Sequence, residues 1–443
     1  MARKEQIAIP ILGTNLQIRT ISLVAVVMIA TIIIATPVAQ AQTLTVIHAF
    51  TGGGDGDFPG PSLVMDRTGN LYGTTFFSGF NSGGGVFELV QRGSGWVLNP
   101  LVNFSGTEGS YTNNVIVGPD GNLYGTNPNG GGVGSCDYEG CGTVFELTPP
   151  VTRCGSAVCP WSLTILYRFT GQADGGNPAG VIFDQVGNLY GTTFYGGNMT
   201  GQCAPYGCGV VYKLSPSNGG WTETVLYAFN GGTNDGANPP EDVIFDSSGN
   251  LYSMTTFGGT EGAGTVFKLT PSGSGWTESV LHNFGNGSDG KYPSSALILD
   301  GSGNFYGTTQ GGGNDGLGTV YSLSPSGSGW TEAVLYSFNG SYGDEYPQFG
   351  RLFLDAPGNL YGTTPGNDGS SPYGDVFQMT PSNGGWSYSS LRSFTGGSDG
   401  GTPYSTVVMD ASGNLYGTAY QGGYTNNDLC QFVGCGVVWK ITR

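Results

Sequence analysis

The chain has few charged residues and almost no histidine. Only 10% of its 443 residues are Asp, Glu, Lys or Arg, while 12% are aromatic, and this composition is typical of a folded protein and not of a disordered one. The two histidines, His48 and His282, cannot supply the three ligands of a catalytic zinc site by themselves. Serine motifs with a histidine base are also absent from the sequence. No catalytic residue is therefore predicted, and both histidines are interpreted as packing residues in a column otherwise held by Tyr167, Tyr227 and Tyr336.

Basic residues are scarce as well. The chain has 14 Lys and Arg against 31 Asp and Glu, a net charge of −17, and removal of residues 1–41 would leave 11 against 30, or −19. Such a surface repels phosphate backbones and anionic lipid headgroups. Nucleic acid is therefore excluded as an expected partner.

No apolar run reaches the roughly 20 residues that a membrane-spanning helix needs. The apolar stretch 21–34 follows Arg3, Lys4 and Arg19 and precedes Ala39-Gln40-Ala41, which predicts a secretory signal peptide over residues 1–41. An uncleaved anchor is the alternative. With cleavage, the mature chain of residues 42–443 has no membrane span and is secreted or periplasmic.

The eight cysteines form four local pairs with identical spacing. Even count, equal spacing and an export signal favour four disulfides over a metal site, which would need shorter spacing or more histidines. The predicted disulfides are Cys136–Cys141, Cys154–Cys159, Cys203–Cys208 and Cys430–Cys435.

Glycine is abundant, with 82 residues, and it separates runs rich in Val, Thr, Tyr and Phe. The tetrapeptide Gly-Asn-Leu-Tyr recurs seven times, with Phe305 replacing Leu in one copy, and this recurrence marks an array of one supersecondary unit. The copies start at Gly69, Gly121, Gly187, Gly249, Gly303, Gly358 and Gly413. The corresponding units span about residues 57–104, 105–170, 171–230, 231–285, 286–339, 340–395 and 396–443.

Each unit is predicted to contain four strands, here named A to D. In the clearest unit these are 296–300 (A), 305–309 (B), 319–323 (C) and 330–338 (D). The last unit ends after its C strand, at 437–441, and the missing D strand is found at 44–50, just after the predicted signal peptide. Pairing of these two segments would close a ring. The predicted fold is therefore an all-β, seven-bladed β-propeller closed by its own N-terminal strand, and a monomer is expected.

Three sets of recurring residues have structural explanations. An Asp three residues before the repeat Gly is expected to cap the A–B turn, while Gly supplies the positive φ. Recurring Tyr and Trp are expected to pack between neighbouring blades, although a sugar-stacking role for the Trp remains an alternative. The Asp set is Asp66, Asp184, Asp246, Asp300, Asp355 and Asp410; the Trp set, at the starts of the D strands, is Trp96, Trp161, Trp221, Trp276, Trp330 and Trp386.

The pattern D-x-x-G-N-L-Y-G-T-T, followed by G-T-V-F-K-L-T-P and W-T-E-x-V-L-Y-S-F, resembles the GloVer-type (choice-of-anchor) tandem repeat of secreted bacterial proteins. The resemblance covers essentially all of residues 44–443. It implies an exported repeat protein and supplies no catalytic residues. A weaker similarity links the D-x-x-G-N-L-Y-G-T segment to the periplasmic propellers of sensor kinases.

If D is the outer strand, the D–A and B–C loops lie on one face of the ring, here called the loop face. Three of the four cysteine pairs fall in its B–C loops, and its D–A loops carry seven acidic residues, which are Asp55, Glu108, Asp174, Asp235, Asp289, Asp344 and Asp399. These residues either cap turns, bind Ca²⁺ through hard oxygen ligands, or provide an acid/base pair for glycan cleavage. Turn capping is favoured, because one Asp per loop is sparse for Ca²⁺ and equivalent repeat positions tend to be alike.

The functional hypothesis is a secreted, non-catalytic scaffold that binds an extracellular protein or glycan and needs no cofactor. The alternative is a Ca²⁺-dependent, carbohydrate-active hydrolase or lyase that uses the acidic loops.

Overall fold

The computed structural model describes residues 42–77, 83–134, 136, 140–150, 161–341, 344, 346–348, 350–366, 373–423, 430 and 433–443. The propeller forms one compact unit, Thr43–Arg443, whose named elements are the strands β1 to β31. The predicted signal peptide (1–41) and the predicted Cys154–Cys159 disulfide lie outside the described residues. Among those described, no helix is long and apolar enough to cross a membrane.

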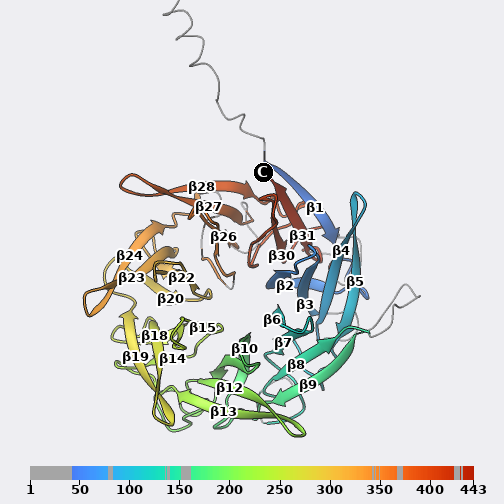
Figure 1. Ribbon diagram of the computed structural model, residues 1–443. Helices are drawn as coiled ribbons and strands as arrows, with labels where there is room; N and C mark the ends of the chain where they lie inside the picture. Colours follow the sequence, from blue (N-terminus) through green and yellow to red (C-terminus); the bar gives the residue numbers. More distant parts are fainter. Residues whose placement is uncertain are drawn as a thin grey trace, which may run out of the picture. The chain divides into compact units, whose positions relative to one another are not determined.

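Seven blades, each with four strands A to D, follow one another around a ring (Figure 1), and the strand order within each blade is A-B-C-D from the centre outwards. This confirms the predicted all-β, seven-bladed propeller. The A strands are β2 (Asp57–Met65), β6 (Asn114–Val117), β10 (Gly176–Phe183), β15 (Ile244–Phe245), β21 (Ile298–Leu299), β25 (Phe353–Leu354) and β29 (Val408–Met409). The blades are numbered 1 to 7 in this order.

The other strands complete the blades in the same order. The B strands are β3 (Leu71–Phe77), β7 (Leu123–Asn127), β11 (Leu189–Tyr195), β16 (Leu251–Thr255), β22 (Phe305–Gly312), β26 (Leu360–Thr364) and β30 (Leu415–Ala419). The C strands are β4 (Gly85–Arg92), β8 (Thr143–Thr148), β12 (Val210–Ser217), β18 (Thr265–Ser272), β23 (Thr319–Ser326), β27 (Asp375–Ser382) and β31 (Val437–Thr442). The D strands are β5 (Gly95–Asn103), β9 (Ser162–Arg168), β13 (Gly220–Ala228), β19 (Gly275–Asn283), β24 (Gly329–Ser337), β28 (Gly385–Ser393) and β1 (Thr43–Ala49).

The N-terminal strand closes the ring. β1 pairs antiparallel with β31, with Thr43 opposite Thr442 and Ala49 opposite Val437, and the two strands lie side by side in Figure 1. Phe50 then donates its N–H to the Gly436 carbonyl at 3.0 Å. The last blade therefore consists of three strands from the end of the chain and one from its beginning, as the sequence predicts.

The A–B turns have the predicted capping geometry. Asp66 accepts the backbone N–H groups of Thr68 and Asn70 at 2.8 and 2.9 Å, and Gly69 has a φ of 88°. The same pair of acceptor bonds recurs at Asp184, Asp246, Asp300 and Asp410. The Asp carboxylate thus accepts hydrogen bonds from backbone N–H groups that would otherwise have no partner in the tight turn.

The recurring Trp and Tyr residues pack between blades, as predicted. Trp96 of blade 1 lies with its ring centroid 5.9 Å from that of Tyr416 in blade 7, and Trp161 of blade 2 lies 6.2 Å from Tyr72 in blade 1. Equivalent Trp–Tyr pairs join blades 4 and 5 and blades 5 and 6, at 6.5 and 6.0 Å. Edge-on contacts of this kind add to the apolar area that each blade buries on its neighbours.

A second contact between blades was not predicted. One non-glycine residue in every D–A loop has a left-handed backbone, with φ between 50° and 61°, and its N–H bonds to the B–C loop of the preceding blade at 2.7 to 3.1 Å. The N–H and carbonyl partners are Phe58 and Cys435, Tyr111 and Gly83, Asn177 and Cys141, Asn238 and Cys208, Tyr292 and Ala263, Tyr346 and Leu317, and Thr402 and Tyr373. This repeated bond fixes where each D–A loop enters the ring.

The left-handed residue also explains why the prediction of 28 strands is incomplete. The chain bends at this position, and the segment before it pairs separately with an extension of the B strand. In blade 4 this gives the additional strands β14 (Gly236–Ala237) and β17 (Phe257–Gly258), and in blade 5 it gives β20 (Gly290–Pro293). The predicted A strand 296–300 accordingly shortens to β21.

Candidate ligand-binding face

Most of the exposed apolar side chains lie on the loop face. Ten large hydrophobic residues of the described part of the chain are strongly exposed, and seven of them belong to D–A or B–C loops or to strand ends that enter those loops. These seven are Val133, Tyr195, Tyr206, Phe257, Tyr292, Tyr346 and Val433. Since apolar groups that gather on one surface mark interaction sites, the loop face is the candidate site.

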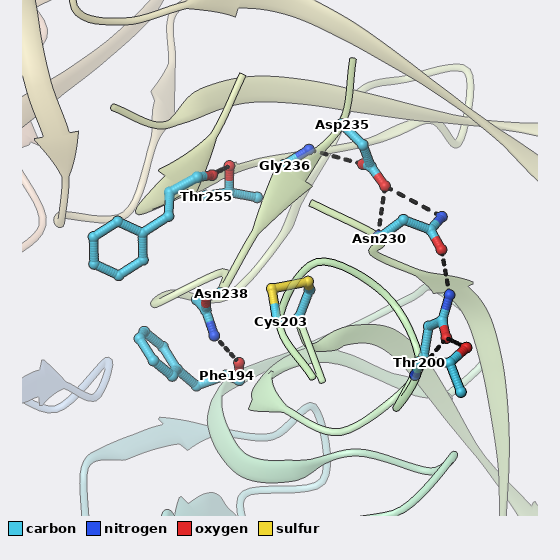
Figure 2. Close-up of a disulfide and its surroundings, with 11 residues drawn as sticks. Phe194, Thr200, Cys203, Asn230, Asp235, Gly236, Asn238 and Thr255 are labelled. Carbon is cyan, nitrogen blue, oxygen red and sulfur yellow. Dashed lines mark hydrogen bonds between the residues drawn. A yellow bond between two sulfur atoms is a disulfide. The ribbon is translucent and has the colours of Figure 1, made fainter. Parts of the chain in front are cut away.

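Three of the predicted disulfides are present in the B–C loops, at Cys136–Cys141, Cys203–Cys208 and Cys430–Cys435. The second of them closes a short loop that carries Tyr206, whose side chain is 70% exposed. Figure 2 shows this disulfide beside Asp235 and Asn238 of the following D–A loop. The cross-link therefore holds an aromatic side chain in solvent at the boundary of blades 3 and 4.

The seven acidic loop residues bond to their own turns. Asp55 accepts the Thr51 N–H at 3.0 Å, Asp174 accepts that of Thr170 at 2.9 Å, and Glu108 accepts that of Ser105 at 3.1 Å. Figure 2 shows the same arrangement at Asp235, which accepts the N–H groups of Asn230 and Gly236 at 2.7 and 2.8 Å.

The remaining three acidic loop residues have similar partners. Asp289 accepts the Gly290 N–H at 2.6 Å, and Asp344 accepts the Tyr336 hydroxyl at 2.8 Å. Asp399 accepts the Thr395 N–H at 3.3 Å and the Arg392 guanidinium at 2.7 Å. Six of the seven residues accept a backbone N–H of their own turn, as turn capping requires, while Asp344 accepts a hydroxyl from the D strand.

The column of His, Tyr and Arg in the D strands provides further partners. His48 lies 3.2 Å from Asp55 and His282 lies 2.9 Å from Asp289, while the Tyr167 hydroxyl donates to Asp174 at 3.2 Å. Both histidine rings also stack edge-on against the next Phe, as Tyr167 does. The histidines are therefore packing substitutes for Tyr, as predicted.

The pKa values of the loop carboxyls differ with their surroundings. Burial acts to raise the pKa of Asp55, but hydrogen bonds from His48 and Thr51 outweigh it, so this pKa lies below its usual value. Burial raises the pKa of Asp344 to about 6, and burial together with the charge of Asp55 raises that of Asp57 to about 6. Equivalent repeat positions are thus less alike electrically than their sequence suggests.

No group of three or more His, Cys, Asp or Glu suited to a metal ion occurs within the described residues. Each carboxylate in the loops has one or more protein donors, so a bound Ca²⁺ would have to replace or share them. The Ca²⁺ hypothesis stays a prediction, and its test is given below.

The centre of the ring holds a charged pair that the sequence analysis missed. One residue from each blade, either within the A strand or two positions before it, lines the channel. These residues are Ser62, Asn114, Gly180, Asp242, Ala296, Arg351 and Thr406. Arg351 of blade 6 donates to Asp242 of blade 4, whose side chain is only 3% exposed. Burial and the nearby Asp242 raise the pKa of Glu241 well above its usual value, although Arg351 opposes the shift.

The channel is too narrow for a large ligand. Its cavity measures about 80 Å³, which accommodates a few water molecules and no sugar ring. A sugar-sized ligand therefore does not fit inside the channel. The signal in the sequence was the appearance of Asp242 and Arg351 in a column whose other members are small or uncharged.

Two aromatic clusters lie on the loop face. The first runs from blade 7 to blade 2 through Tyr404, Tyr420, Phe58, Phe77 and Tyr111, whose successive ring centroids are 5.7, 4.7, 5.9 and 5.3 Å apart. The second lies in blade 3.

In the second cluster, Phe194 contacts Tyr195 at 4.9 Å and Tyr195 contacts Tyr206 at 6.3 Å. The sequence analysis did not single out either cluster. The members of the first come from three different blades, and those of the second lie in one blade but outside the repeated positions.

These features define a class of protein: a closed seven-bladed β-propeller whose repeated residues build the ring and whose variable loops gather apolar side chains on one face. A model of the Gloeobacter/Verrucomicrobia repeat family matches residues 31–204 and 198–430. The chain belongs to this family, in agreement with the resemblance found in its sequence. No curated protein matches the chain.

Solved structures share the fold at low sequence identity. A crystal structure of a putative 6-phosphogluconolactonase from Bacteroides uniformis matches with a TM-score of 0.51 and 13% identity, covering 84% of this chain and 99% of the other. A fungal alcohol oxidase in complex with copper matches at 0.51 and 12%, covering 90% and 76%. An ulvan lyase bound to -[GlcA(1-4)Rha3S]- matches at 0.50 and 10%, covering 87% and 94%. These matches show that the fold is shared. Because the matched proteins are named for different activities, the fold does not identify one function.

Proposed function

We propose that the protein is a secreted binding module that contacts an extracellular protein or glycan with its loop face. The observation that carries the proposal is the gathering of seven of the ten strongly exposed large hydrophobic residues on that face. The acidic residues of the same face bond to their own turns, which leaves the apolar and aromatic side chains as the main contact groups. The disulfides of the B–C loops are suited to an oxidising compartment.

The test is a screen of the mature chain, residues 42–443, on glycan and protein arrays. A loop-face variant, Tyr206→Ala with Phe257→Ala, is compared with a control, Val97→Ala with Val186→Ala, whose residues are equally exposed on the opposite side of the ring. We expect the loop-face variant to lose at least tenfold in affinity for the ligand found and the control to bind normally. Equal losses in both variants would contradict the proposal.

The alternative of a Ca²⁺-dependent hydrolase or lyase has less support. It needs loop carboxylates that are free to bind a metal or to transfer protons, whereas those of Asp289 and Asp399 already accept hydrogen bonds. Melting with and without EDTA tests the metal, because a bound Ca²⁺ stabilises the folded state by mass action. Asp289→Asn with Asp399→Asn tests the chemistry, since these changes should abolish turnover in an enzyme and leave a binding scaffold nearly unaffected.

A further inference from the structure

The loop face is hollowed where blades 7, 1 and 2 meet. A groove of about 450 Å³ lies between the B strand of blade 1 and loops of the two neighbouring blades. Its apolar walls include Phe76, Tyr111, Tyr404 and Tyr420. This volume is in the range of sites that bind small organic molecules or one or two residues of a polymer.

The polar groups of the groove are side-chain amides. Asn113, Asn129 and Gln421 line it, and no residue in its lining carries a charge at neutral pH. Within the described part of the chain, the side-chain amides of Asn113 and Gln421 form no hydrogen bond. Each amide offers donors and an acceptor together, which matches the hydroxyl groups of a sugar.

The backbone around the groove is already paired. Ser110 and Asn129 bond to each other through both N–H groups, at 2.8 and 3.4 Å, and Gly401 and Gln421 do the same at 3.0 Å. An extended peptide that binds by strand addition needs free backbone groups at a sheet edge. Recognition in this groove must therefore use side chains, which disfavours such a peptide.

The aromatic rings form a row and not a single pocket. Tyr420 lies between Phe58 at 4.7 Å and Tyr404 at 5.7 Å, and Phe76 lies 5.9 Å from Tyr420. All four rings are half-buried, so each is held by packing on one side. Rigid aromatic surfaces of this kind bind apolar faces with little loss of conformational entropy.

Charge decides which polymer fits. The chain carries a net charge of −17, and the groove has no Lys or Arg to pair with a carboxylate or sulfate. A polyanion would be repelled, whereas an uncharged polymer would not. We propose that this groove binds a neutral polysaccharide, with its sugar rings against Tyr111 and Tyr420 and its hydroxyls on the amides of Asn113 and Gln421.

The inference rests on the proposed binding function and deepens it, and variants of the groove test it. Tyr111→Asn removes a ring from the groove, and Asn already occupies the same left-handed position at Asn177 and Asn238. Val97→Ala with Val186→Ala, on the opposite side of the ring, is the binding control because it leaves the loop face unchanged. Tyr420→Ala provides a second change within the groove, and circular dichroism melting checks that every variant is folded.

Affinity electrophoresis and calorimetry would use xyloglucan and galactomannan as neutral probes and alginate and polygalacturonate as anionic ones. We expect binding to a neutral probe, a loss of at least tenfold in Tyr111→Asn and Tyr420→Ala, and unchanged binding in the Val97→Ala, Val186→Ala control. Binding to anionic probes alone, or an equal loss in the control, would overturn the inference.

Two further outcomes separate this inference from the proposed function. Neutral glycan binding that depends on Tyr206 and not on Tyr111, or binding to a protein on the array with no glycan bound, would overturn the groove and leave the binding module. Absence of any ligand in both screens would overturn the two together.

Discussion

Aromatic residues in a left-handed backbone conformation are unusual, because their Cβ approaches the neighbouring carbonyl. Phe58, Tyr111, Tyr292 and Tyr346 nevertheless adopt it, with φ between 50° and 61°. Each such residue costs on the order of 1–3 kcal/mol of folding free energy, and it persists only where the surrounding structure imposes the conformation. Here the surroundings do so through the N–H bond to the preceding blade.

We expect Tyr292→Asn to keep or raise the melting temperature, since Asn tolerates this conformation and retains the N–H bond to Ala263. Tyr292→Val should lower stability by about 1–3 kcal/mol, because a β-branched side chain fits the conformation poorly. Chemical unfolding of the two variants measures the difference. Equal stabilities would show that the backbone at this position is not strained.

The sequence could predict the capping Asp residues but not the left-handed ones. The motif Asp-Gly-x-x-Pro marks five of the seven D–A turns, yet rules of local conformation assign positive φ to Gly and not to Phe or Tyr. The conformation depends on a carbonyl from another blade, which lies far away in the sequence. For the same reason the pair of Asp242 and Arg351, from blades 4 and 6, could not be found from spacing.

At the scale of the strand, the outer strands carry buried acids. Burial, followed by the charge of Asp174, raises the pKa of Glu223 to about 7, and burial with the charges of Asp235 and Asp289 does the same for Glu278 and Glu332. These side chains belong to the D strands of blades 3, 4 and 5. Their protonated forms are thus favoured in the folded state.

A Glu whose pKa is raised in the folded state contributes stability at pH values below 4.5, which is its pKa in the unfolded chain. This contribution is lost as the pH rises through its folded pKa of about 7. The capping Asp residues act in the opposite direction, since hydrogen bonds outweigh burial and lower the pKa of Asp66 and Asp246 below 3.8. We therefore expect the melting temperature to be highest near pH 4–5 and to fall towards pH 8.

The control for this pH dependence is the triple variant Glu223→Gln, Glu278→Gln and Glu332→Gln. Its melting temperature should fall less between pH 5 and 8 than that of the wild-type protein if the three acids contribute to the effect. A smaller fall should remain, because the pKa values of Asp57 and Asp344 are also raised to about 6. A melting temperature of the wild-type protein that rises from pH 5 to pH 8 would contradict the prediction.

The B–C loops closed by disulfides contribute to stability separately from the strands. Replacement of Cys203 and Cys208 by Ser should lower the free energy of unfolding by about 2 kcal/mol, because the cross-link restricts the unfolded chain. Urea unfolding measures the loss. Reduction of this variant should then lower the free energy of unfolding less than reduction of the wild-type protein does. An equal loss would assign the stabilisation to the other disulfides.

The B, C and D strands were predictable because their β-branched and aromatic runs repeat in every blade. The D strands also alternate in exposure at their starts, whereas the B strands are buried over their first five residues. The A strands were harder, since they shrink to two residues in blades 4 to 7. The inner positions of the A strands face a narrow channel and need no large apolar side chain. The apolar run in the sequence is therefore longer than the strand that forms.

At the scale of the whole molecule, the ring depends on one pairing between the two ends of the propeller. Deletion of residues 42–49 removes β1, exposing the edge of β31 and the side chains of Val437 and Trp439. An open sheet edge of this kind promotes aggregation. We expect the truncated protein to be insoluble or to melt well below the intact chain.

A circular permutant provides the control. In it, residues 42–50 follow Arg443 through a short linker, so that blade 7 is made from one continuous segment and β1 still pairs with β31. We expect it to fold with nearly wild-type stability. Should the permutant be as unstable as the truncated protein, terminal pairing would not be what closes the ring.

The carbonyl that each B–C loop offers to the next blade has an evolutionary consequence. Only one backbone group near the end of that loop, such as Cys208 or Ala263, is needed to hold the neighbour, and a backbone group is present whatever the side chain. Insertions and substitutions upstream of it leave the scaffold intact. Related chains can therefore vary the B–C loops in length and sequence while the propeller beneath them stays unchanged.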